Sequence, residues 1–159
     1  MVLEALELAK KELKRADHLI FVSLKYTRTV DVIKNVILRL ISVFDFGFEA
    51  LLRKVVQEKK LKEVPKLTRI RVDEIKKFYG QDAMIMAFVE FYLLLRKIDR
   101  ASFDRKMEYR RHVTMTAELE GERIEITIDI ISDYFERAKE FISYVEEIVV
   151  GKKEGEESD

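Results

Sequence analysis

The chain has 159 residues, a length that suits one domain able to bury its own core without disulfides or metals. It has no cysteine, which excludes disulfide frameworks, thiolate zinc sites and cysteine nucleophiles. The longest apolar run, residues 83–95 with Glu90 inside it, is too short to cross a bilayer, and the amino terminus is not a signal peptide. We therefore expect an intracellular, cytoplasmic protein with no membrane association. Charged residues make up 38% of the chain, which is typical of proteins from thermophiles.

The formal net charge of zero conceals an asymmetry. Residues 1–112 contain 25 Lys and Arg against 16 Asp and Glu, whereas residues 113–159 contain 5 against 14. In one interpretation the acidic carboxyl-terminal segment packs beside the basic body and neutralises it. In the other, a basic surface stays open to nucleic acid or another polyanion.

Apolar residues that recur every three to four positions predict helices over most of the chain. The second expected helix, residues 30–59, is apolar on more than one face, so we place it at the centre of the bundle. Gly47 lies within it and predicts the close approach of another helix. Thr27 or Thr29 can cap its amino end. The other expected helices cover residues 2–26, 72–79, 83–100 and 130–149.

The periodicity changes after residue 112. Apolar and polar residues then alternate in two short segments, marked by Val113, Met115, Ala117 and Leu119 and by Ile124, Ile126 and Ile128. This pattern predicts a β-hairpin at about 113–128, although the second segment could instead begin the last helix. Residues 151–159 are expected to form a disordered acidic tail. The predicted fold is mainly α, an up-and-down bundle of about five helices with a small β-hairpin near the carboxyl end, in a single domain of residues 1–150.

Few side chains form a pattern that specifies a reaction. The chain has only two histidines, His18 and His112, and no glycine-rich phosphate loop, so we expect no metal and no cofactor. Glu90 is either a buried general base or a residue at the edge of the bundle. The acidic residues of the last helix are best explained as a solvated surface.

Two clusters combine cations with aromatic rings. Lys25, Tyr26 and Arg28 can hold a phosphate or stack a base, or else Tyr26 closes the end of the core while the cations are solvated. The densest basic patch is residues 105–112. The candidate nucleic-acid-binding residues are Lys25, Tyr26, Arg28, Arg110 and Arg111.

A long helix pair opens with Arg15-Ala-Asp-His18 and continues with Tyr26-Thr-Arg-Thr29, and shorter helices follow it. This pattern resembles the HEPN superfamily of helical-bundle proteins, most closely its uncharacterised archaeal branches, over roughly residues 1–100 and the last helix. Nucleases of that superfamily dimerise and cleave RNA without metal, using an Arg and a His with four to six residues between them. Arg105 and His112, with six residues between them, are the catalytic pair that the resemblance implies. Many members lack this motif and act as binding or structural modules.

Two functions follow as expectations. The wide apolar surfaces of the second and fourth helices favour a homodimer packed through one of them, which predicts a non-enzymatic interaction module that acts with another protein. The alternative is an RNA-binding protein or a metal-independent ribonuclease that uses Arg105, Arg110, Arg111 and His112.

Overall fold

The computed structural model describes residues 1–151. Its elements, in chain order, are α1 (Val2–His18), a π-helical segment η1 (Leu19–Ser23), α2 (Leu24–Tyr26), α3 (Val30–Gln57), α4 (Thr68–Tyr79), α5 (Ala83–Arg100), β1 (Phe103–Lys106), β2 (Thr114–Leu119), β3 (Glu122–Ile126) and α6 (Ile128–Val150). The prediction of a mainly α protein with a small β element near the carboxyl end is confirmed. Apart from Gly151, the predicted tail lies outside the described residues.

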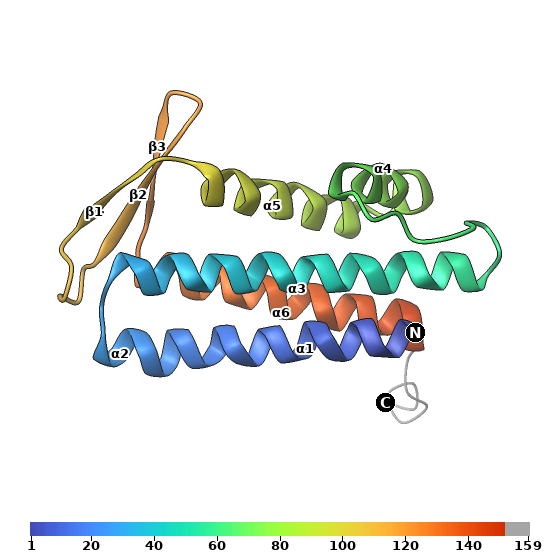
Figure 1. The fold of residues 1–159 in the computed structure, drawn as a ribbon, viewed down its shortest axis with the longest axis horizontal. Helices are drawn as coiled ribbons and strands as arrows, with labels where there is room; N and C mark the ends of the chain where they lie inside the picture. The colour runs from blue at the N-terminus through green and yellow to red at the C-terminus, as the bar shows by residue number, and fades with distance from the viewer. Residues whose placement is uncertain (152–159) are drawn as a thin grey trace.

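The long helices run up and down along one axis (Figure 1). The continuous rod of α1, η1 and α2 runs in one direction, α3 returns, α5 runs with the first rod and α6 returns. Helix α3 is central, as predicted, because it contacts α1, α4, α5, α6 and β2. The short α4 crosses the bundle near the start of α5. Within residues 1–151, no helix combines the length and the apolar character needed to span a membrane.

The middle of the core is an aromatic cluster contributed by α3, α5 and α6. Phe44 stacks on Phe141 with 4.4 Å between ring centroids, and Phe88 meets Phe141 edge-on at 5.1 Å. Gly47 makes this approach possible, because a Cβ at that position would overlap the ring of Phe141. The prediction that Gly47 marks a close helix approach is confirmed.

The apolar surface of α3 is covered by the chain itself. Ile33, Phe44 and Leu51 are fully buried, together with most of the other apolar residues of this helix. The width of this surface therefore needs no second subunit to explain it. On α5, Leu93 and Leu94 remain partly exposed. The homodimer stays a prediction.

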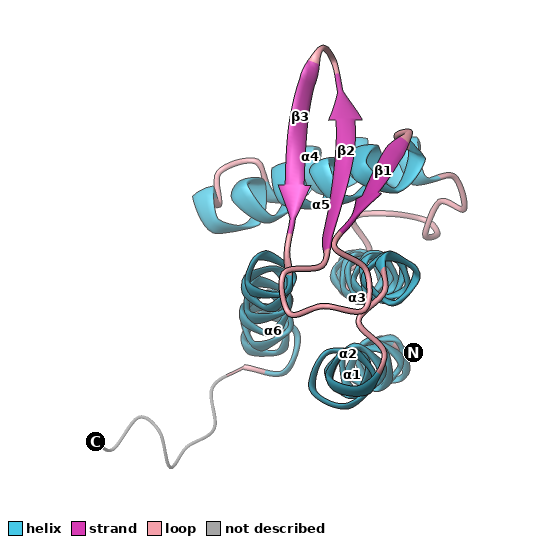
Figure 2. Ribbon diagram, turned by 90° about the vertical axis from the view of Figure 1, so that its left-hand side faces the viewer, coloured by secondary structure: helices cyan, strands magenta, loops and turns pink. Residues whose placement is uncertain are grey.

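Three antiparallel strands in the order β1-β2-β3 extend from the end of α5 (Figure 2). Strands β2 and β3 are the predicted hairpin, in which Leu119 pairs with Glu122. The alternative, that this second segment begins the last helix, is wrong. Strand β1 was not predicted; it pairs along β2 with Phe103 opposite Ala117. The apolar residues that anchor the sheet on the bundle are buried, among them Val113, Met115, Ala117 and Ile126.

Two helix starts and one segment inside the first rod differ from expectation. Helix α4 begins at Thr68 instead of residue 72. Helix α6 begins at Ile128 instead of residue 130, because the Thr127 hydroxyl accepts a hydrogen bond from the amide of Ile130 at 3.2 Å and caps the helix two residues earlier. The first rod contains the π-helical segment Leu19–Ser23, which the apolar pattern did not reveal.

Candidate nucleic-acid interface

One end of the bundle joins two segments that lie far apart in the sequence. The turn between β1 and β2 rests on the connection between α2 and α3 (Figure 2). The amide of Tyr109 donates to the carbonyl oxygen of Arg28 at 2.6 Å, and Glu108 Oε2 accepts from the amide of Val30 at 3.0 Å. The two predicted basic clusters therefore form one bundle-end surface, defined here as Lys25, Tyr26, Arg28, Tyr109, Arg110, Arg111 and His112.

The turn has an unusual backbone. Met107 and Tyr109 have φ angles of 57° and 67°, in the left-handed region that residues other than glycine rarely adopt. Such conformations cost of order 1–3 kcal/mol each and persist only where surrounding contacts hold them. The hydrogen bonds of Tyr109 and Glu108 to the start of α3 supply such contacts. The strained turn presents the Tyr109 ring to solvent.

A pocket of ≈ 490 Å³ opens on the bundle-end surface. Arg28, Arg111 and His112 line it, together with Thr114 and residues 127–129 at the start of α6. The amino end of a helix carries partial positive charge, which adds to that of the two arginines. Asp129 offsets part of this charge and offers carboxylate oxygens as hydrogen-bond acceptors.

Two tyrosine rings project from the bundle-end surface. Tyr26 is 79% exposed and Tyr109 is 78% exposed. The interpretation that Tyr26 closes the end of the core is therefore wrong. An exposed ring offers its face for stacking by a nucleic-acid base.

The cations of the bundle-end surface differ from Lys10 on the side of the bundle in having no acidic partner within residues 1–151. On the side of the bundle, Lys10 of α1 pairs with Glu146 of α6 at 2.6 Å, so the acidic carboxyl-terminal helix does neutralise part of the basic body. Among residues 1–151, no ion pair involves any of the basic side chains Lys25, Arg28, Arg110 and Arg111. The first interpretation of the charge asymmetry therefore holds at Lys10, whereas a basic surface open to nucleic acid stays a prediction.

Arg105 is not among the residues that line the pocket containing His112. Its guanidinium forms an ion pair of 2.9 Å with Asp31 in the first turn of α3 and lies over the ring of Phe103 at 5.3 Å. The hydrogen bond to Asp31 raises the pKa of Arg105. Arg105 thus anchors the edge strand β1 to α3, and its pairing with His112 in catalysis stays a prediction.

Comparisons of the chain with protein-family models, with curated proteins and with solved structures found no match. The resemblance to the HEPN superfamily stays a prediction.

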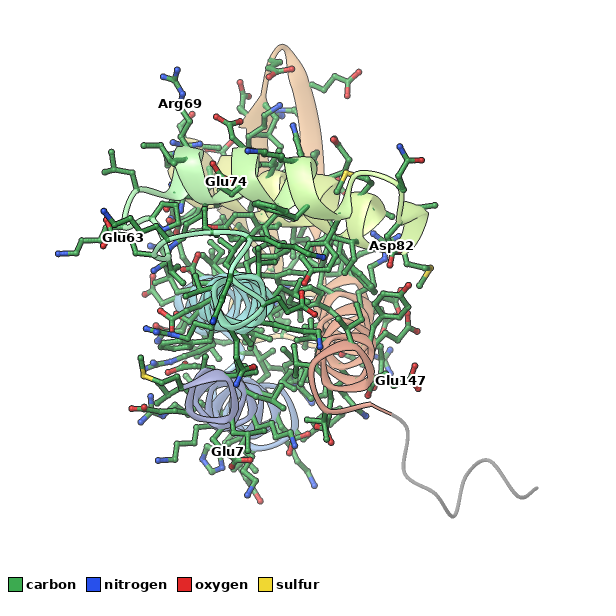
Figure 3. All side chains as sticks on the ribbon, turned by 90° about the vertical axis from the view of Figure 1, so that its right-hand side faces the viewer. Glu7, Glu63, Arg69, Glu74, Asp82 and Glu147 are labelled. Carbon is green, nitrogen blue, oxygen red and sulfur yellow. The ribbon has the colours of Figure 1, made fainter. Side chains whose placement is uncertain are left out.

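The other acidic candidates are not arranged as a reaction centre. Glu90 is exposed on the outer side of α5, so the hypothesis of a buried general base is wrong. Within residues 1–151, no three His, Asp or Glu side chains are grouped to hold a metal. Asp82, on the opposite end of the bundle (Figure 3), caps α5 and accepts from the Tyr144 hydroxyl at 2.7 Å.

One half-buried acid, Asp45, was not singled out from the sequence. The Tyr92 hydroxyl of α5 donates to Asp45 Oδ1 of α3 at 2.5 Å. Burial raises the pKa of Asp45, while the hydrogen bond and the charges of Arg96 and Arg71 act in the opposite direction. Burial and the same hydrogen bond raise the pKa of Tyr92. This pair joins two helices inside the core.

Proposed function

We propose that the bundle-end surface binds single-stranded RNA. The observation that carries this proposal is the attachment of the β1–β2 turn to the start of α3. It places two exposed tyrosines among four basic side chains that form no ion pair within residues 1–151. Proteins bind single strands by stacking bases on aromatic rings and by neutralising phosphates with Lys and Arg. A duplex keeps its bases stacked on each other, so Tyr26 and Tyr109 favour a single strand.

The pocket supports RNA over DNA. Arg28 and Arg111 can contact a phosphate, and the Asp129 carboxylate at the pocket wall can accept a hydrogen bond from a ribose 2′-hydroxyl. DNA lacks that donor and would meet the negative charge of Asp129 without compensation. We therefore expect RNA to bind more tightly than DNA of the same sequence.

Binding without cleavage fits the position of Arg105. The Arg105 guanidinium is held by Asp31 and Glu108, at 2.9 and 3.8 Å, and does not line the pocket. Under this proposal, RNA incubated with the protein in EDTA stays intact. Cleavage that is lost in His112→Ala would favour the ribonuclease alternative instead.

Fluorescence anisotropy with a labelled single-stranded RNA of about 12 nucleotides tests the proposal. We expect the affinity to fall steeply between about 50 and 200 mM salt, as it does when phosphate contacts dominate. Arg111→Gln should weaken binding about tenfold. Tyr109→Ala should weaken it about fivefold or more, because base stacking contributes roughly 1–3 kcal/mol.

Arg69→Gln is the matched control, because Arg69 is an exposed arginine at the opposite end of the bundle (Figure 3). This variant should keep the wild-type affinity for RNA. The absence of binding at low salt would refute the proposal, and so would an equal loss of affinity in Arg69→Gln and Arg111→Gln.

A further inference from the structure

A second pocket, of ≈ 400 Å³, lies between α1 and α3 on the side of the bundle. It is lined by Lys14, Arg15, His18, Leu19, Asn35 and Arg39, and we call it the side pocket. Arg39 comes nine residues after the first residue of α3, which places it about 14 Å along the helix from the bundle end. The side pocket is therefore separate from the bundle-end pocket, with which it shares no lining residue.

A buried carboxylate organises this pocket. Glu12 is only 7% exposed, on the face of α1 that packs against α3. It accepts hydrogen bonds from Arg15 Nη1 at 2.7 Å and from Arg39 Nη1 at 3.2 Å. A carboxylate in such a position is costly unless it is paired. Glu12 thereby fixes two guanidinium groups from two different helices beside one pocket.

Most N–H donors of the two guanidinium groups are not used by Glu12. Each has five N–H donors, and Glu12 engages Nη1 of each. Arg15, Arg39 and Lys14 together outweigh the single charge of Glu12, so a ligand of this pocket should be an anion. Two adjacent guanidiniums match the several acceptor oxygens of a phosphate group.

The backbone beside the pocket is irregular. The π-helical segment Leu19–Ser23 begins directly after His18, and π-helical turns inside α-helices occur frequently at functional sites. Leu19, its first residue, lines the pocket. This leucine and the aliphatic stems of the arginines provide an apolar wall next to the cations. The side pocket thus has cationic side chains that can bind a phosphate group, and an apolar wall against which the rest of an organic ligand can pack.

We propose that the side pocket binds a small organic phosphate monoester. The phosphate lies between Arg15 and Arg39, and the organic part packs against Leu19. The pocket volume lies within the range of sites that hold small molecules. This site does not depend on the binding of RNA at the bundle end.

Adenosine 5′-monophosphate is a suitable probe, with inorganic phosphate and adenosine as its two parts. In a ¹H–¹⁵N NMR titration, the monophosphate should shift the amides of residues 14–19 and 35–39 and saturate below about 1 mM. Inorganic phosphate and adenosine should each shift the same amides, but both should bind more weakly than the monophosphate. Arg39→Gln should weaken the binding of the monophosphate about tenfold, whereas the control variant Arg69→Gln should leave it unchanged.

Arg39→Gln removes one of the two partners of the buried Glu12 and could therefore disturb folding as well as binding. A second variant separates these two effects. Asn35→Asp changes an exposed side chain of the pocket and repels an anion without touching Glu12, so it should weaken binding to a similar extent. Shifts confined to residues 109–114, unchanged affinity in both variants, or equal affinity for adenosine and its monophosphate would overturn the proposal. A loss of RNA affinity in Arg39→Gln would also overturn it, by making the side pocket part of the RNA surface.

Discussion

The amide of Tyr109 donates its hydrogen bond to the carbonyl oxygen of Arg28, a residue 81 positions earlier in the chain. This contact connects the strand turn to the helix junction and brings the two basic clusters together. The sheet thus contributes to the candidate site by holding one turn in place.

Glu108→Ala should loosen this attachment. The amide of Val30 would lose its acceptor and Arg105 one of its two carboxylate partners, so we expect a loss of about 1 kcal/mol in the free energy of unfolding. RNA affinity should fall several-fold, because the turn is no longer fixed. Urea denaturation and fluorescence anisotropy measure the two effects.

Glu136→Ala, which removes an exposed pair with Lys139, should change stability by less than about 0.5 kcal/mol. An unchanged RNA affinity in Glu108→Ala would show that the surface does not depend on this attachment.

Two substitutions of Tyr109 separate the effect of its strained backbone on stability from the effect of its ring on RNA binding. Both Tyr109→Gly and Tyr109→Ala remove the exposed ring, so both should weaken RNA binding to a similar degree. The glycine variant should be more stable than the alanine variant by about 1 kcal/mol, because only glycine adopts a φ of 67° without steric cost. Thermal unfolding of the two proteins gives this difference. Equal stability would mean that the turn relaxes when the ring is removed.

Gly47→Ala should destabilise the protein although alanine is the better helix former. The added methyl group overlaps the ring of Phe141, and overpacking of this kind costs about 1–3 kcal/mol, against a gain of about 1 kcal/mol in helix propensity. Urea denaturation measures the net change. Combining Gly47→Ala with Phe141→Leu should cost less than the sum of the two single substitutions, because the smaller side chain makes room. Strict additivity would argue against a direct clash.

Asp45 predicts a specific dependence of stability on pH. The pKa of Asp45 is raised in the folded protein above its ordinary value of 3.8. The contribution of this carboxyl to stability is therefore complete below that value and is lost as the pH rises through the folded pKa. The stability of Asp45→Asn relative to the wild type should therefore increase between pH of about 4 and 7. Melting temperatures across this range measure the trend. Asp133→Asn, at an exposed position of α6, controls for the loss of a carboxylate as such. A trend of the opposite sign would show that the hydrogen bond from Tyr92 outweighs burial.

The helices and the hairpin were predictable because their signals are local. The apolar stripe of α3 lies within that helix, and the alternation of Met115, Ala117 and Leu119 lies within β2. Strand β1 escaped detection because Phe103-Asp-Arg-Lys contains a single apolar residue, and its conformation is fixed by pairing with β2. The start of α6 was misplaced because Ile128 fits both a strand and a helix period; the Thr127 cap decides between them.

The residues of the bundle-end surface could largely be predicted from the sequence, but the spatial proximity of the two basic clusters could not. Lys25, Tyr26, Arg28 and the run from Arg105 to His112 stood out as basic clusters with aromatic rings. Tyr109 lies inside that run and its ring could have been singled out with them. The contribution of Asp129 had no sequence signal, because it depends on how α6 enters the bundle. The side pocket was missed for a similar reason, since Glu12 and Arg39 meet only across two packed helices.

Two amides in the first turn of α3 have hydrogen-bond acceptors from very different positions in the chain. The Thr29 hydroxyl, next to the helix in the chain, accepts from the amide of Val32, but the amide of Val30 relies on Glu108 from the strand turn. The two long helical rods can associate through contacts close in sequence, whereas this one amide stays open to water until the strands have paired and docked. Hydrogen exchange at Val30 therefore reports on detachment of the sheet, and it should be faster than exchange in the middle of the same helix.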